Sequence, residues 1–321
     1  MKRSELKKLI QGVACASPTP FDTNFRVDYG RMAEMTQWYV ESGLVTGKGY
    51  IKVASLMGEN AMLRDNEWPH LLRTVVQAAG GKVPVLCGSS HHKDTVRTVE
   101  DSKIAQDLGA IGLQIPPPMH SDPTQEDVLR YYDDISNAID IGIMIYNTHW
   151  ERRGNRFGLI TPNTFQKMVD IEKIVAIKWS YYEPEGFPYE EMERFSQVFN
   201  IIDNGPRPIL CHKLGGRGYI SATSPANPHH DLQFWDLLEN RRYEEAHALW
   251  SKVNASLGDF SGKMQKRSGG DSRVPKALMA VMGHPAGPPR PPSEPLNGEE
   301  MAELRSLAIS WGWPVPGDQK N

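Results

Sequence analysis

One lysine lies inside a strongly apolar stretch of the chain. Lys178 belongs to the run IVAIKW (Ile174–Trp179), which we interpret as a strand buried on both faces. An ammonium group in such surroundings is costly unless it is paired or neutralised. Removal from water lowers the pKa of a lysine, and the neutral amine attacks carbonyl groups to form imines. The sequence therefore predicts a Schiff-base lysine at Lys178. The alternative is a lysine that points outward between helices, an interpretation that also applies to Lys52 in YIKVAS.

A tyrosine stands where it could serve that lysine. Tyr146 closes the apolar part of GIMIYN (Gly142–Asn147), and its separation from Lys178 equals one strand–helix unit. In a barrel of parallel strands, both side chains would then emerge from neighbouring strands at the same end. A phenol there is able to carry a proton to and from a carbonyl oxygen during imine formation. The alternative is an aromatic residue of the core.

The surrounding pattern is a repeated alternation of short apolar runs and longer amphipathic stretches. We interpret eight runs as strands: Gly12–Ser17, Tyr50–Ser55, Val83–Gly88, Ile111–Pro116, Gly142–Asn147, Ile174–Trp179, Asn200–Asp203 and Gly218–Thr223. The expected helices are Tyr29–Ser42, Arg64–Ala79, Lys93–Leu108, Thr124–Ile139, Pro162–Val169, Tyr189–Val198 and Pro208–Leu214. The pattern predicts a (β/α)₈ TIM barrel over residues 1–230, followed by a helical appendage over residues 231–321 packed on it. A doubly wound sheet is the alternative, but no GxGxxG or Walker-type loop is present.

Composition restricts the class of protein further. The chain has 321 residues and a net charge of −3, which gives no basis for binding nucleic acid or an anionic membrane. No apolar run is long enough to cross a bilayer, and the basic N-terminus lacks the apolar core of a secretory signal, so we expect a cytoplasmic enzyme. The three cysteines are far apart and are expected to be buried free thiols. The pairs His91-His92 and His229-His230 are expected to be surface residues, and no metal site is predicted.

Taken together, these motifs resemble a known family along almost the whole chain. The resemblance is to the dihydrodipicolinate synthase/N-acetylneuraminate lyase superfamily. The segments that carry it are SPTPF (Ser17–Phe21), MGENAML (Met57–Leu63), PPPMHSDPTQED (Pro116–Asp127), YN (Tyr146–Asn147), IK (Ile177–Lys178), GGRGYISATSPANP (Gly215–Pro228) and RVPKALMAVMG (Arg273–Gly283). Each motif alone is weakly specific, but their order along the chain makes the resemblance strong.

The resemblance implies a class I lyase that needs no metal or organic cofactor. A 2-oxo acid, often pyruvate, would form an imine on Lys178, with Tyr146 as proton shuttle, and aldol cleavage or condensation, hydration-aldol chemistry or dehydration would follow. His120 aligns with a tyrosine that family members donate to a neighbouring subunit, which implies a homodimer or homotetramer. Arg156 is the best match for an arginine that holds a distal substrate carboxylate, with Arg152 and Arg153 as competitors. Ile220, in the eighth-strand segment, would contact substrate.

The chain departs from the family at one substrate-binding loop. Where the family has two hydroxyl residues before Gly-Glu, this chain has Leu56 and Met57 before Gly58. Backbone N–H groups of Leu56, Met57 and Gly58 would still be able to bind a carboxylate. The loss leaves open whether pyruvate is a substrate or product. Together with Met119 and Trp150 in adjoining loops, Leu56 and Met57 predict an apolar entrance to the site and a substrate with an apolar or aromatic tail.

Two alternatives to this function follow from the same observations. The first is an enzyme of the same fold that acts on a carbonyl compound other than pyruvate or its derivatives. The second is a ligand-binding relative that has lost turnover, against which the intact pair of Tyr146 and Lys178 argues.

Overall fold

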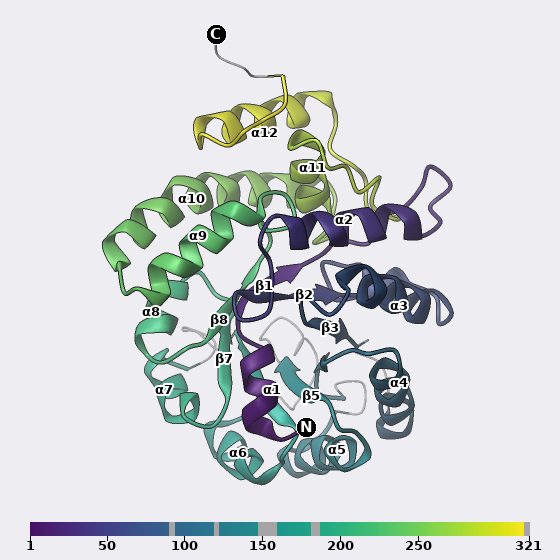
Figure 1. The fold of residues 1–321 in the computed structure, drawn as a ribbon, viewed down its shortest axis with the longest axis vertical. Coiled ribbons are helices and arrows are strands. Elements are labelled where there is room, and N and C mark those ends of the chain that lie inside the picture. The colour runs from purple at the N-terminus through teal and green to yellow at the C-terminus, as the bar shows by residue number, and fades with distance from the viewer. Residues whose placement is uncertain (90–93, 119–121, 147–158, 181–186, 318–321) are drawn as a thin grey trace.

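The chain folds into a closed barrel of parallel strands. The computed structural model describes residues 1–89, 94–118, 122–146, 159–180 and 187–317. Within them, each strand pairs in parallel with the next and β8 pairs with β1 (Figure 1). The strands are β1 (Gly12–Ala16), β2 (Gly49–Val53), β3 (Val85–Gly88), β4 (Gly112–Ile115), β5 (Gly142–Tyr146), β6 (Ile174–Trp179), β7 (Asn200–Asp203) and β8 (Gly218–Ser221). The predicted (β/α)₈ barrel is confirmed.

Helices cover the outside of the barrel in the order expected from the sequence (Figure 1). They are α2 (Tyr29–Glu41), α3 (Glu67–Ala79), α4 (Thr95–Asp107), α5 (Gln125–Ala138), α6 (Pro162–Lys167), α7 (Glu190–Ser196) and α8 (Pro208–Lys213). Their ends differ slightly from the predicted ranges because capping residues lie outside the helix proper. Thr124, for example, is the N-cap of α5, and its side chain accepts a hydrogen bond from the backbone N–H of Asp127.

An N-terminal helix, which the sequence patterns did not predict, closes one end of the barrel. This helix, α1 (Arg3–Leu9), leads into β1. Leu6 and Ile10 are fully buried and pack with Ala14, Tyr50 and Met144 in the barrel interior. The short basic segment therefore fills the amino-terminal end of the barrel, so the opposite end is left for a site.

Four helices follow β8. They are α9 (Pro228–Glu239), α10 (Tyr243–Arg267), α11 (Arg273–Val281) and α12 (Gly298–Ser310). The predicted boundary between residues 230 and 231 falls inside α9, and α9 packs against β1 as a helix of the barrel would. A separate unit over residues 231–321 therefore stays a prediction.

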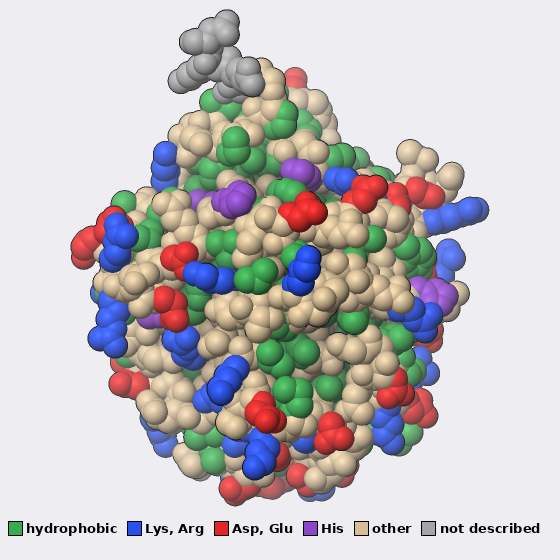
Figure 2. Space-filling view, in the orientation of Figure 1, with side chains coloured by type: hydrophobic (Ala, Val, Ile, Leu, Met, Phe, Trp, Pro, Cys, Tyr) green, Lys and Arg blue, Asp and Glu red, His purple; other side chains and the backbone are tan. Residues whose placement is uncertain are grey.

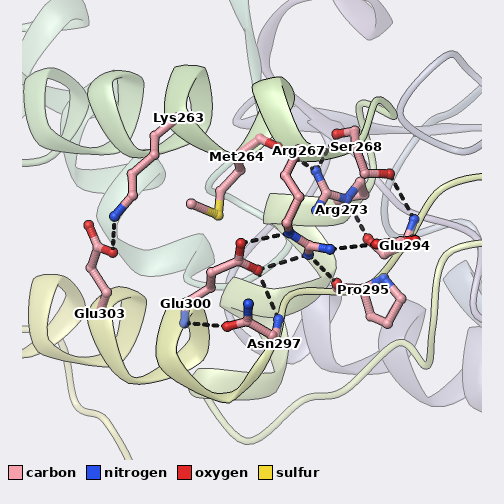
Figure 3. A network of polar contacts seen from close by, with 10 residues as sticks. All are labelled: Lys263, Met264, Arg267, Ser268, Arg273, Glu294, Pro295, Asn297, Glu300 and Glu303. Atoms are coloured by element: carbon pink, nitrogen blue, oxygen red, sulfur yellow. Dashed lines mark hydrogen bonds and ion pairs between the residues drawn. The ribbon is translucent and has the colours of Figure 1, made fainter.

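A polar network holds the C-terminal helices together at the end of α10. Figure 3 shows Arg267, in the last turn of α10, pairing with Glu294 and Glu300, while Arg273 at the start of α11 donates to the carbonyl oxygen of Met264. Asn297 caps α12 by accepting from the backbone N–H of Glu300. These contacts fix the turn between α10 and α11, which matters for the site described below.

The cysteines lie as the sequence predicts, whereas one of the histidines does not. Cys15, Cys87 and Cys211 are buried free thiols, as expected. His229 is exposed, but the prediction for His230 is wrong: its ring is buried 5.3 Å from that of Trp313. Acidic and basic side chains are interspersed on the face drawn in Figure 2. None of the described helices is both long and apolar enough to cross a membrane.

Candidate active site

Tyr146 and Lys178 lie side by side at the carboxyl end of the barrel. They are paired in register on the adjacent strands β5 and β6. The Lys178 Nζ lies 3.7 Å from the centre of the Tyr146 ring, and both side chains are buried. An aromatic face attracts an ammonium group, so the ring offsets part of the cost of taking Lys178 out of water. The predicted neighbours therefore meet as the strand spacing requires.

These two side chains open into a cavity of about 500 Å³. Its described lining comprises Lys52, Leu56, Met57, Tyr146, Lys178, Asn204, Ile220, Gln265 and Asp271. Five residues expected from the sequence are thus brought together: the lysine–tyrosine pair, Leu56, Met57 and Ile220. The lining is more polar than the expected apolar mouth, because Lys52, Asn204, Gln265 and Asp271 also face it.

The loop after β2 holds Leu56 and Met57 in a tight turn. Ala54 and Glu59 have φ values of 48° and 57°, in the left-handed region that non-glycine residues rarely adopt. The loop also approaches itself closely: a Cβ on Gly58 would lie 3.0 Å from the backbone nitrogen of Ser55. Gly58 is not among the described lining residues, and its carbonyl oxygen accepts a 2.6 Å hydrogen bond from Thr19. In this structure Gly58 shapes the loop rather than facing the cavity.

Glu59 anchors this loop to the C-terminal segment rather than to its own backbone. Its Oε1 lies 2.6 Å from the Nζ of Lys276, and its Oε2 accepts from the backbone N–H of Arg290. Burial lowers the pKa of Lys276 to about 8, and the charge of Glu59 acts in the opposite direction. These contacts give Glu59 a structural role in the loop after β2.

Lys52 is a second lysine of the cavity, and the outward orientation considered for it is wrong. The side chain is 2% exposed and points into the barrel, where its Nζ donates a 3.1 Å hydrogen bond to Oε1 of Gln114. Burial, together with the positive charge of Lys178, lowers the pKa of Lys52 well below its ordinary value, while Asp271 opposes this shift. The same signal that singled out Lys178, a lysine in a buried strand, was present at Lys52.

Asp271 and Gln265 reach the cavity from the C-terminal helices. Gln265 lies in the last turn of α10, and Asp271 lies just before α11. Asp271 lines the cavity and its side chain is exposed. Partial removal of the carboxyl group from water raises its pKa, and the charges of Lys178 and Lys52 act in the opposite direction. No sequence signal marked these two residues, because nearly 90 residues separate Lys178 from Gln265 along the chain.

Several predicted site residues lie outside the described part of the chain. These are His120, Met119, Trp150 and the three candidate arginines Arg152, Arg153 and Arg156. Among the described residues, no group of three or more His, Cys, Asp or Glu side chains is placed to hold a metal ion.

Comparison with known proteins gives a consistent result. The sequence profile of the Dihydrodipicolinate synthetase family matches residues 9–310. A 4-hydroxy-tetrahydrodipicolinate synthase from Heliobacterium modesticaldum is 29% identical over 307 residues, which cover 92% of this chain and 94% of the relative. The 4-hydroxy-tetrahydrodipicolinate synthase 1 from Halalkalibacterium halodurans is 26% identical, with 93% of this chain and 96% of the relative covered.

Solved structures show the same fold. Dihydrodipicolinate synthase from Oceanobacillus iheyensis superposes with a TM-score of 0.81 at 20% identity, covering 97% of this chain and 99% of that one. The enzyme from Acinetobacter baumannii, solved in complex with pyruvate, gives 0.79 at 21% identity, with 95% and 99% covered. From the match of the family profile over nearly its whole length, this chain belongs to the Dihydrodipicolinate synthetase family and is a lyase of the Schiff-base aldolase type.

Proposed function

We propose that Lys178 forms an imine with the ketone carbon of a 2-oxo acid. The observation that carries the proposal is a buried lysine amine over the ring of Tyr146, at the carboxyl end of a barrel and on the wall of a cavity. The neutral amine attacks the ketone carbon, and the carbonyl electron pair moves to oxygen. After two protons reach that oxygen, it leaves as water, and an iminium joins Nζ to the former ketone carbon.

Tyr146 is the proton carrier in this scheme. Its hydroxyl is on the ring that lies 3.7 Å from Lys178 Nζ, so both groups reach the same reacting carbon. The phenol gives a proton to the oxygen that leaves and takes back the one that the amine loses. The iminium then withdraws electrons from the neighbouring carbon, so that a carbon–carbon bond forms or breaks there, or water is lost from it.

The substrate class is supported by the relatives and by the cavity. Those relatives are named 4-hydroxy-tetrahydrodipicolinate synthases, and one solved neighbour holds pyruvate. In this chain Leu56, Met57 and Ile220 line the cavity, so we expect the tail of the oxo acid to contact them and to be apolar or aromatic. Competition between matched 2-oxo acids with aryl and polyhydroxylated tails tests this: a tenfold preference in kcat/KM for the polyol contradicts it.

Further roles are proposed for residues outside the described ranges. His120 would be a second proton carrier, shared between subunits of a homodimer or homotetramer, and Arg156 would hold a distal substrate carboxylate. The enzyme would work in the cytoplasm. Light scattering that shows an active monomer removes the cross-subunit role of His120.

Reductive trapping tests the central proposal. The protein is incubated with a panel of 2-oxo acids and cyanoborohydride, which reduces imines in preference to ketones, and the intact mass is measured. One adduct is expected, with the mass of the oxo acid less one oxygen atom. Peptide mapping places it on Lys178 or on Lys52, the other lysine of the cavity.

The matched variants are Lys178→Ala and Lys213→Ala. Lys213 lies in the last turn of α8, away from the cavity, and its loss is expected to leave labelling unchanged. An adduct that persists in Lys178→Ala, or that maps to Lys52, contradicts the assignment. So does the absence of any adduct across the panel.

A further inference from the structure

Lys52 is a buried cation with unused hydrogen-bonding capacity. Its ammonium group has three N–H donors, and Gln114 is the hydrogen-bond acceptor found for it among the described residues. No described carboxylate lies within ion-pair distance of it. The side chain nevertheless lines the cavity, so the remaining donors are available to a molecule held there. A buried charge without an anionic partner is costly, and such groups are retained where they serve a function.

The charges of the cavity favour an anion beside Lys52. Lys52 and Lys178 line the same cavity, and Asp271 is the carboxylate in its described lining. Burial and the neighbouring positive charge lower the pKa of Lys52. A bound anion would act in the opposite direction and favour the ammonium form. On the β2 side, Leu56 and Met57 offer apolar side chains, so their side chains provide no donor for an anion.

We propose that Lys52 binds the carboxylate of the 2-oxo acid whose ketone carbon reacts with Lys178. The inference rests on the proposed function. In a 2-oxo acid the carboxylate is bonded directly to the ketone carbon, so the group that binds it must share a cavity with the lysine that forms the imine. Lys52 meets that condition, and Gln114 acts as its positioning residue. Lys52 remains unmodified throughout, because it contributes charge and hydrogen bonds rather than a covalent bond.

The test compares two probes that differ in charge. Pyruvate carries a carboxylate, and pyruvamide has nearly the same shape with a neutral amide in its place. Cyanoborohydride trapping on Lys178 is measured as a function of the concentration of each probe. In Lys52→Met the concentration of pyruvate at half-maximal trapping is expected to rise by about 10- to 100-fold, the range for one hydrogen bond to a charged group. The value for pyruvamide is expected to change by less than about threefold.

Two further variants separate this role from others. Gln114→Glu places a carboxylate against Lys52, so it should weaken trapping by pyruvate and spare pyruvamide, although Lys52 is intact. Tyr50→Phe is the matched control, since Tyr50 is on the same strand in the apolar floor of the barrel. Tyr50→Phe should leave the concentrations of pyruvate and of pyruvamide at half-maximal trapping unchanged. Thermal unfolding checks each fold, and Lys52→Gln replaces Lys52→Met if the latter does not fold.

The outcomes are distinct. Equal weakening of both probes in Lys52→Met overturns the proposal, because it indicates that Lys52 acts on Lys178 or on the fold rather than on the carboxylate. Unchanged trapping by pyruvate also overturns it. If neither probe nor any other 2-oxo acid labels the unmodified enzyme, the proposed function itself fails.

Discussion

The two ends of the barrel interior are built from the same strands but differ in chemistry. At the amino-terminal end the inward residues are Tyr50, Met144, Ala176 and Ile202, all fully buried and packed against Leu6 and Ile10. Two residues further along the chain from each of them lie Lys52, Tyr146, Lys178 and, just after the end of β7, Asn204, and these four line a cavity. Successive inward side chains on a strand lie two residues apart, so the core residue and the cavity residue of each pair are neighbours on the same face.

The two ends of the barrel therefore contribute differently to stability and to chemistry. Apolar side chains and α1 fill the floor, where burial stabilises the fold. The positions at the carboxyl end, which we call the upper end, carry groups that are costly to bury. The packing of the floor and of the surrounding helices offsets that loss of stability. Substitutions at the upper end should therefore affect chemistry, and substitutions at the floor should affect stability.

Replacement of Lys178 should have the largest effect. Lys178→Met keeps an unbranched side chain, one atom shorter, but has no amine, so turnover should fall by on the order of 10⁶-fold, the scale for removing a covalent nucleophile. Met fills most of the volume of the lysine side chain, so the variant should still fold. Steady-state kinetics and the urea unfolding midpoint measure the two effects. A marked loss of stability would show that the upper end also serves the fold.

Tyr146→Phe should have the next largest effect. The ring beneath Lys178 is retained and only the hydroxyl is lost, so kcat should fall by roughly 10²–10⁴-fold while the fold is kept. Trapping on Lys178 should still occur, but more slowly. If kcat is unchanged, the proton travels by another group, and the same measurement on His120→Gln would identify the next candidate.

Met144→Ala tests the floor two residues below Tyr146. Met144 is fully buried, and its Sδ accepts a 3.7 Å hydrogen bond from the Tyr50 hydroxyl. The cavity left behind should lower the free energy of unfolding by about 2–5 kcal/mol. The folded variant should retain kcat within a few-fold. A large loss of kcat with unchanged stability would contradict the division between the two ends.

A carboxyl group that belongs to neither end should make stability depend on pH. Asp203 of β7 is buried and accepts a 2.9 Å hydrogen bond from Tyr189; burial raises its pKa to about 7, while this bond acts in the opposite direction. In the unfolded chain its pKa is about 3.9. The folded state therefore binds more protons between about pH 4 and 7, and this contribution to stability is lost as pH rises through that window.

Asp203→Asn removes this titration while keeping the shape of the side chain. Urea unfolding is measured at several pH values. Between about pH 4 and 7, the free energy of unfolding of the wild type should fall with pH by up to about 1.4 kcal/mol per pH unit more than that of the variant. The two curves should run parallel outside that window. Parallel curves inside it would mean that Asp203 is already ionised in the folded state at low pH.

The sequence by itself determined the fold and the central pair of residues. Eight apolar runs at regular spacing leave few topologies other than a closed barrel, and parallel pairing places the ends of adjacent strands together. Tyr146 and Lys178 were predictable because their neighbourhood depends only on strand order and register, which local patterns encode. The family motifs added the loop after β2, from which Leu56 and Met57 reach the cavity.

Only the tertiary structure decided which other groups join them. Because barrel strands are buried on both faces, their sequences lack the alternation that would tell an inward residue from an outward one, so the orientation of Lys52 could not be predicted. Gln265 comes from the end of α10 and Asp271 from the turn before α11, a segment that folds back over the barrel mouth, and α1 closes the other end. Such contacts depend on how distant segments pack, and no local pattern in the chain encodes that packing.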